Sequence, residues 1–179
     1  MKKTFALAAF SFMVCACDAS QTIETKNQPA NEIRPNILLI MADDLGYSDI
    51  KSFGGEISTP NLDDLAAGGL KMSNLYAASA CSPTRTMLLG GADSHRGGMG
   101  TMYNDQTANQ LGQPGYEGYM NHDVVSVATL LQDAGYDTYM TGKWHLGYEE
   151  DQSPKARGFK RSFGLLQGGS SHFDDAPMT

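Results

Sequence analysis

The sequence lacks several features that would place it in a specialised class of protein. It has only three cysteines in 179 residues, and it contains no internal repeat. It also lacks clusters of Lys and Arg, and its formal net charge is −7. Because binding to a nucleic-acid backbone needs such clusters, we predict no nucleic-acid partner. An acidic protein that acts on an anion must instead build its positive field locally, with a metal ion or a few convergent cations.

The amino-terminal apolar stretch is too short to span a bilayer as a helix. Two lysines precede the apolar residues 5–16, which is the pattern of a signal peptide, and we assign residues 1–16 to it. Residues 14–17 (VCAC) resemble a bacterial lipobox, in which Cys17 becomes the lipidated first residue. Cys15 departs from that pattern, so an ordinary secretory cleavage site nearby is the alternative. We expect an exported, periplasmic protein, held at the membrane as a lipoprotein through Cys17.

A single thiol is then left in the mature chain. Cys15 is removed with the signal peptide and Cys17 is acylated, so Cys81 has no cysteine with which to form an internal disulfide. In an oxidising compartment a lone thiol is either buried and inert or has a chemical purpose.

The folded part is expected to begin at about residue 34, after a polar, flexible tether over residues 17–33. The continuous apolar run Ile37–Met41 predicts a strand buried on both faces of a parallel sheet. Asp43 and Asp44 follow at its carboxyl end, where ligands bind in open α/β sheets. Their carboxylates suit a hard divalent cation, and a solvated acidic turn is the alternative.

Helices and strands are expected to alternate along the rest of the chain, which is typical of an α/β fold. Helix signals cover residues 59–69, 82–89 and 126–134, and strand signals cover 70–76 and 136–141. Residues 90–122 are rich in Gly, Asn, Gln and Tyr and predict a long loop of the kind that often carries function.

Cys81 is expected at the amino terminus of the helix over 82–89. Unpaired N–H groups and a partial positive charge at that terminus make a site for a tetrahedral anion such as sulfate. Arg85, in the first turn, can hydrogen-bond to the same anion and neutralise it. The competing interpretation of Cys81 is a small buried core residue.

Lys143 and His145 lie two residues apart at the end of the strand over 136–141, so their side chains can point to the same side. Taken without context, they would be a surface lysine and a hydrogen-bonded core histidine.

The segment Cys81–Arg85 (CSPTR) fits the C-x-P-x-R signature of type I sulfatases. The following residues 86–91 (TMLLGG) and the later residues 142–147 (GKWHLG) are similar to that family in the expected order. The resemblance runs from about residue 35 to residue 173 and is closest to bacterial arylsulfatases. It implies the alkaline-phosphatase-like sulfatase fold, a mixed and largely parallel sheet sandwiched by helices. Gly90 departs from the threonine that is common at that position.

The resemblance also implies an activity, the hydrolysis of sulfate esters, together with the cofactors and site residues. A formylglycine-generating enzyme would convert Cys81 to formylglycine, and the hydrated aldehyde would be the nucleophile. Calcium would be bound by Asp43, Asp44 and the hydroxyl at position 81. Lys143 would hold a sulfate oxygen, and His145 would act as a base.

Members of this family are more than twice as long as this chain. Residues 34–179 would therefore be the amino-terminal part of a catalytic domain, and we expect this polypeptide alone to be inactive and poorly folded. One rival function is hydrolysis of phosphonate monoesters or phosphodiesters within the same superfamily. The other is a truncated lipoprotein that binds anions without catalysis. The alcohol part of the ester, from a small molecule or a carbohydrate, is not identified by these residues.

Overall fold

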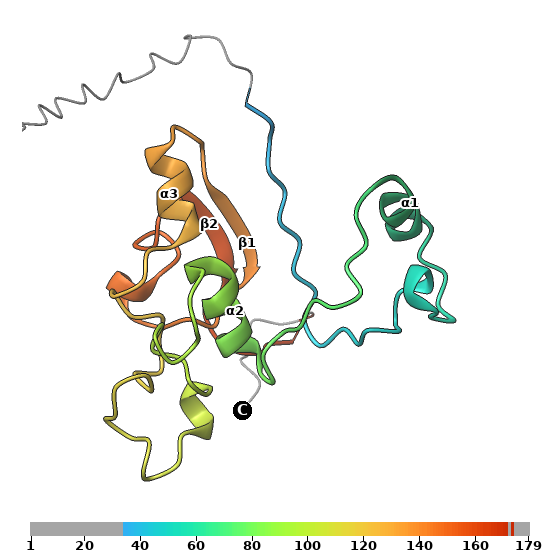
Figure 1. The fold of residues 1–179 in the computed structure, drawn as a ribbon. Helices are drawn as coiled ribbons and strands as arrows, with labels where there is room; N and C mark the ends of the chain where they lie inside the picture. The colour runs from blue at the N-terminus through green and yellow to red at the C-terminus, as the bar shows by residue number, and fades with distance from the viewer. Residues whose placement is uncertain (1–33, 172, 174–179) are drawn as a thin grey trace, which may run out of the picture. The chain divides into compact units, whose positions relative to one another are not determined.

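The computed structural model describes residues 34–171 and residue 173 (Figure 1). The predicted signal peptide and tether, with Cys17, lie outside these residues. Contacts divide the chain into two units, Met1–Ile40 and Met41–Thr179, and the helices, strands and site belong to the second. Three 3-10 helices accompany the helices and strands of the described residues: η1 (Lys51–Phe53), η2 (Tyr103–Asp105) and η3 (Glu150–Gln152).

The three predicted helices are present with small shifts of their ends. They are α1 (Pro60–Gly68), α2 (Cys81–Gly90) and α3 (Val127–Asp133). The Ser126 hydroxyl accepts a hydrogen bond of 3.1 Å from the N–H of Ala128, which caps α3 as expected. Gly91 ends α2 in the left-handed region, at φ 60°. No helix in residues 34–171 is long and apolar enough to cross a membrane.

One helix cap differs from the expectation. Thr59 precedes α1, but its hydroxyl donates to a carboxylate oxygen of Asp63 at 3.1 Å and makes no hydrogen bond to the helix backbone. Helix α1 begins with Pro60, whose fixed φ suits the first helical position.

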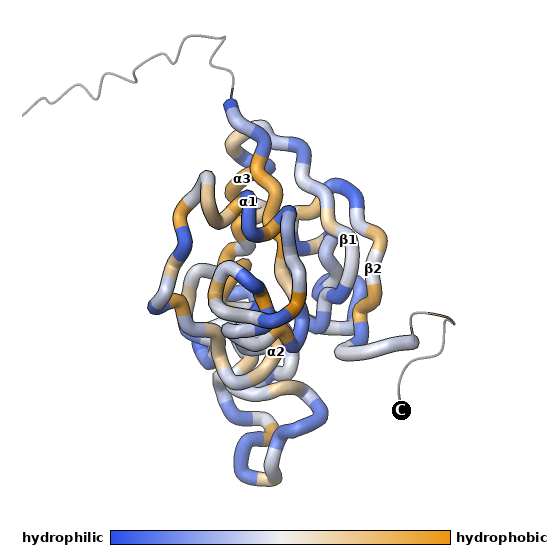
Figure 2. The backbone as a smooth tube through the Cα atoms, turned by 90° about the vertical axis from the view of Figure 1, so that its right-hand side faces the viewer, coloured by the Kyte–Doolittle hydropathy of each residue, from blue (hydrophilic) through white to orange (hydrophobic). Residues whose placement is uncertain are grey.

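The sheet of the described residues consists of two parallel strands, β1 (Tyr139–Lys143) and β2 (Arg161–Leu165). Tyr139 pairs with Arg161 and Lys143 pairs with Leu165, so the two strands run side by side (Figure 1). Strand β1 begins three residues later than the predicted strand over 136–141. Strand β2 was not predicted from the sequence, although its apolar residues stand out along the tube in Figure 2.

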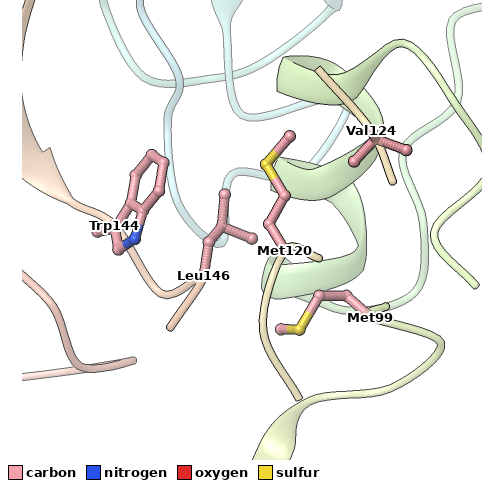
Figure 3. Packing of buried hydrophobic residues seen from close by; sticks show 5 residues of the cluster. All are labelled: Met99, Met120, Val124, Trp144 and Leu146. Atoms are coloured by element: carbon pink, nitrogen blue, oxygen red, sulfur yellow. The ribbon is translucent and has the colours of Figure 1, made fainter. Parts of the chain in front are cut away.

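A small core lies between α2, the loop that follows it and the end of β1. Five buried side chains form it (Figure 3): Met99, Met120, Val124, Trp144 and Leu146. A Cβ on Gly90 of α2 would lie 3.2 Å from Met120 and 3.4 Å from Val124, so the helix packs directly on this core. Each such side chain contributes roughly 1.5–3 kcal/mol by leaving water. The core therefore fixes α2 against the strand that precedes His145.

Two predicted strands, over 37–41 and 70–76, are wrong for the structure as described. Neither segment forms a strand, and their apolar side chains are exposed, with Leu38 at 83% and Leu70 at 82%. A strand buried on both faces needs a neighbouring strand and covering helices. Within the described residues the sheet has only β1 and β2, so these apolar segments find no pairing partner there.

Candidate active site

Cys81 is the first residue of α2, and Ala80 is the cap residue that precedes it. Ala80 before it is extended, at φ −143° and ψ 160°, and the first backbone bond of the helix runs from Thr84 to the Ala80 carbonyl. The N–H groups of Cys81 and Ser82 precede that bond, as the first donors of a helix do. The predicted position of Cys81 at a helix amino terminus is therefore confirmed, and its side chain is partly exposed rather than buried in a core.

The side chain of His145 lies beside Cys81. The sulfur of Cys81 is 3.2 Å from Nδ1 of His145, although the two residues are 64 positions apart in sequence. His145 is 8% exposed and adopts φ 57°, an uncommon conformation for a residue other than glycine. Its backbone N–H donates to the carbonyl of Leu166 at 3.1 Å. The ladder between β1 and β2 thus continues past β1 and turns the imidazole towards the thiol.

The surroundings of His145 favour its neutral form. Burial lowers the pKa of His145, and the positive charges of Lys143 and Arg85 lower it further. The carboxylates of Asp43 and Asp105 act in the opposite direction and are outweighed. A neutral imidazole has a nitrogen that accepts a proton, which is what a general base at this position needs.

Asp43 joins the two cations of the site. Lys143 Nζ lies 2.7 Å from one of its carboxylate oxygens, and Arg85 Nη2 lies 3.0 Å from the other. Burial alone would raise the pKa of Asp43, but hydrogen bonds from Lys143 and Arg85, and their charges, outweigh burial and hold it below its ordinary value. Asp43 is therefore a carboxylate at neutral pH, and it aligns both cations.

Arg85 does not lie in the first turn of α2, where it was predicted. It is the fifth residue of α2 and thus lies just beyond the first turn. Its second terminal nitrogen, Nη1, donates to the backbone carbonyl of Lys143 at 2.6 Å, while Nη2 binds Asp43. The buried guanidinium accordingly ties α2 to the end of β1 and to Asp43.

The predicted metal ligands Asp43, Asp44 and Cys81 do not form a ligand cluster. No group of three or more His, Cys, Asp or Glu side chains in the described part of the chain is arranged to hold a metal ion. Both oxygens of Asp43 face cations, and the sulfur of Cys81 faces His145. The two adjacent carboxylates suit a hard cation in kind, but they supply fewer than the about six to eight oxygens that calcium takes.

Two residues near Cys81 were not predicted from the sequence. Met102 places its thioether sulfur 3.4 Å from the sulfur of Cys81, and Asp105 is close enough to act on the charge of His145. Both lie in the loop over 90–122, which was expected to carry function as a whole. The sequence indicated these two residues only through their place in that loop, shortly after α2.

The family model for sulfatases matches residues 35–178. This chain belongs to the sulfatase family. Its fold is the α/β, alkaline-phosphatase-like fold of sulfatases, of which the described residues form a small parallel sheet with helices. Members of this family generally depend on formylglycine and a metal ion.

Relatives with known names support this assignment. An uncharacterized sulfatase of Schizosaccharomyces pombe is 51% identical over 158 residues, which cover 86% of this chain and 28% of that protein. The arylsulfatase of Klebsiella aerogenes is 47% identical over 148 residues, covering 82% of this chain and 31% of that protein. The crystal structure of PsFucS1 sulfatase from Pseudoalteromonas sp. is similar with a TM-score of 0.56 and 34% identity, covering 70% and 25% of the two chains. The chain thus spans less than a third of the curated relatives it matches.

Proposed function

We propose that this protein contributes the nucleophile half of an arylsulfatase-type active site that hydrolyses sulfate monoesters. The observation that carries the proposal is the 3.2 Å contact between Cys81 and His145, made at the amino terminus of a helix that begins with C-x-P-x-R. A nucleophile next to a neutral base, beside two aligned cations, is the arrangement that transfer of an anionic group needs.

The residues of this chain have separate tasks in the proposed reaction. The first N–H groups of α2 and the ammonium of Lys143 bind sulfate oxygens and neutralise their charge. Arg85 holds α2, Asp43 and the carbonyl of Lys143 in register, so that the cation and the nucleophile keep their spacing. His145 accepts a proton from the group at position 81, because burial keeps its imidazole neutral.

Formylglycine made from Cys81 would supply a hydrated aldehyde with one hydroxyl to attack sulfur and a second to release sulfate, and calcium would lower the pKa of the attacking hydroxyl. Asp43 and Asp44 are the residues of this chain that would hold calcium. Asp44 adopts φ 55°, in the left-handed region, so the backbone turns directly after Asp43. Further ligands are needed beyond these two carboxylates.

The rival within the superfamily is hydrolysis of phosphonate monoesters or phosphodiesters. No contact in the described residues favours a phosphorus substrate, and the relatives named above are sulfatases. We therefore propose sulfate esters as the substrate class. Export and a lipid anchor on Cys17 belong to the same proposal, and they rest on the sequence of residues 1–17 alone.

Mass spectrometry tests both modifications in one experiment. The longest polypeptide that the gene encodes is expressed in a bacterial host with a formylglycine-generating enzyme, then digested and analysed. We expect the Cys81 peptide to show the mass loss of thiol-to-aldehyde conversion, and the amino-terminal peptide to begin at a lipid-bearing Cys17. A Cys81→Ser variant serves as the unconverted control. An intact, alkylatable thiol at position 81 would contradict the proposed function. An unlipidated amino terminus would contradict the proposed lipid anchor.

A further inference from the structure

The two segments that touch Cys81 each carry an exposed tyrosine, and the two rings meet. Met102, whose sulfur is 3.4 Å from that of Cys81, is followed directly by Tyr103 in η2. His145, 3.2 Å from the same sulfur, is followed three residues later by Tyr148. The ring centroids of the tyrosines are 6.1 Å apart with the planes at 69°, an edge-to-face pair. A pair of aromatic rings therefore lies next to the reacting position.

Both rings are open to solvent, and the ring of Tyr103 is held in place. Tyr103 is 53% exposed and Tyr148 is 39% exposed. A Cβ on Gly118 would lie 2.5 Å from the ring of Tyr103, so the ring packs directly on that glycine backbone. The end of η2 is tied by Gln106, whose side chain donates to the carbonyl of Tyr116 at 2.6 Å. Rings that are held and yet exposed are suited to contact a ligand at little cost in side-chain entropy.

Acidic residues outnumber basic ones in the segments that carry the rings. Asp105 completes η2 after Tyr103, and Glu149, Glu150 and Asp151 follow Tyr148, with Lys155 as the nearby basic residue. All four acids belong to exposed residues, although the Glu149 side chain caps η3 and Asp151 lies 3.5 Å from Nε2 of His122. Like charges repel, so a leaving group with further sulfate groups is disfavoured at this rim, whereas the reacting sulfate is met by Lys143 and the amino terminus of α2.

We propose that Met102, Tyr103 and Tyr148 form the subsite for the alcohol part of the substrate, and that it takes an uncharged ring, aryl or pyranose, carrying a single sulfate ester. This inference rests on the proposed sulfatase function and names its substrate class. The flat face of the ring contacts the tyrosines, and the thioether of Met102 contacts its edge near the ester oxygen.

The test uses the longest polypeptide that the gene encodes, after mass spectrometry has verified formylglycine at position 81. We compare Tyr103→Ala and Tyr148→Ala with their Phe counterparts and with Tyr139→Ala, an exposed tyrosine of β1 that is 60% exposed. The substrates are 4-nitrophenyl sulfate, a monosulfated pyranose and acyclic butyl sulfate. Each Ala variant should lower kcat/KM for a ring substrate by about threefold to tenfold, because an aromatic contact is lost.

The acyclic substrate separates a subsite from a folding defect. We expect kcat/KM for butyl sulfate to fall less than that for the ring substrates in both Ala variants, the Phe variants to keep the rate on ring substrates, and Tyr139→Ala to match the unchanged enzyme on all substrates. Whichever ring substrate loses rate identifies the source of the ring, aryl or sugar. Equal losses on butyl sulfate, or no loss on either ring substrate, would overturn the subsite. Absence of turnover of every sulfate ester by the unchanged enzyme would instead overturn the proposed function, and the subsite with it.

A second comparison tests the charge of the rim. A disulfated pyranose should react with a lower kcat/KM than the monosulfated one, and Glu150→Gln should narrow this difference by removing one repelling charge. Equal or faster reaction of the disulfated substrate would contradict the requirement for an uncharged ring.

Discussion

Residues 34–76 have a higher fraction of apolar residues than residues 81–166, but the two regions bury them very differently. In the later region Trp144 is 1% exposed and Leu146 is 0% exposed, and both belong to the core below α2. In the earlier region Leu38 and Leu70 are more than four-fifths exposed. Hydrophobicity alone therefore did not decide which apolar residues became buried.

The difference lies in where each segment finds its hydrogen-bond partners. A helix such as α2 closes its bonds within one short segment, and β1 finds a parallel partner in β2 only 22 positions later along the register. The apolar segments over 37–41 and 70–76 have no such partner among the residues that the structure describes. Local pairing thus separates the ordered site region from the exposed strand sequences.

The largest expected effect is on the stability of the packed region. Trp144→Ala should lower the free energy of unfolding by about 3–5 kcal/mol, because it leaves a cavity next to Leu146 and Met120. The matched substitution Leu70→Ala in the exposed region should change it by less than about 0.5 kcal/mol. Urea denaturation of the longest polypeptide that the gene encodes, followed by circular dichroism, measures both. Similar losses in the two variants would show that the two regions are packed alike.

An intermediate effect is expected where Arg85 ties α2 to β1. In Arg85→Lys a single ammonium replaces two guanidinium donors, so the Lys143 carbonyl or the Asp43 carboxylate loses its partner. The free energy of unfolding should fall by about 1–3 kcal/mol. Arg96→Lys, at an exposed position of the loop, is the control and should be neutral. The same urea denaturation measures both variants. If Arg85→Lys is as stable as Arg96→Lys, the contacts of Arg85 with the Lys143 carbonyl and Asp43 do not stabilise the protein.

The smallest expected effect is a shift in the titration of His145. Its pKa lies below the ordinary value because of burial and then of Lys143 and Arg85, so Lys143→Met should raise it. As pH falls below the ordinary pKa of about 6.5, the unfolded chain binds a proton that the native His145 does not. The stability contribution of His145 is therefore complete above that pH and is lost as pH falls towards the native pKa.

Nuclear magnetic resonance of the His145 ring during a pH titration measures this shift. Lys155→Met, which removes an exposed lysine near η3, is the matched control and should leave the His145 titration unchanged. An unaltered titration in Lys143→Met would show that Lys143 does not contribute to the electrostatics of the base.

Several parts of the site could be predicted from the sequence because they depend on neighbouring residues. Ser126 and Gly91 mark helix ends by capping and by the left-handed conformation, and the helix that begins at Cys81 follows from its local sequence. The position of Lys143 at the end of a strand also follows from local pattern. Strand β2 could not be predicted in this way, because it is defined by its pairing with β1, 22 positions earlier, and not by the few residues around it.

The sequence by itself determined the family, the position of Cys81 at a helix amino terminus and the local elements that carry the site, since motifs and helix signals act over a few residues. Only the tertiary structure decided which groups meet. It joins Asp43 to both Arg85 and Lys143, brings His145 and Met102 to the same sulfur, and leaves the predicted metal ligands without a cluster. The physical reason is that each of these contacts joins segments that are distant in the chain, and core packing and cross-strand hydrogen bonds set their positions.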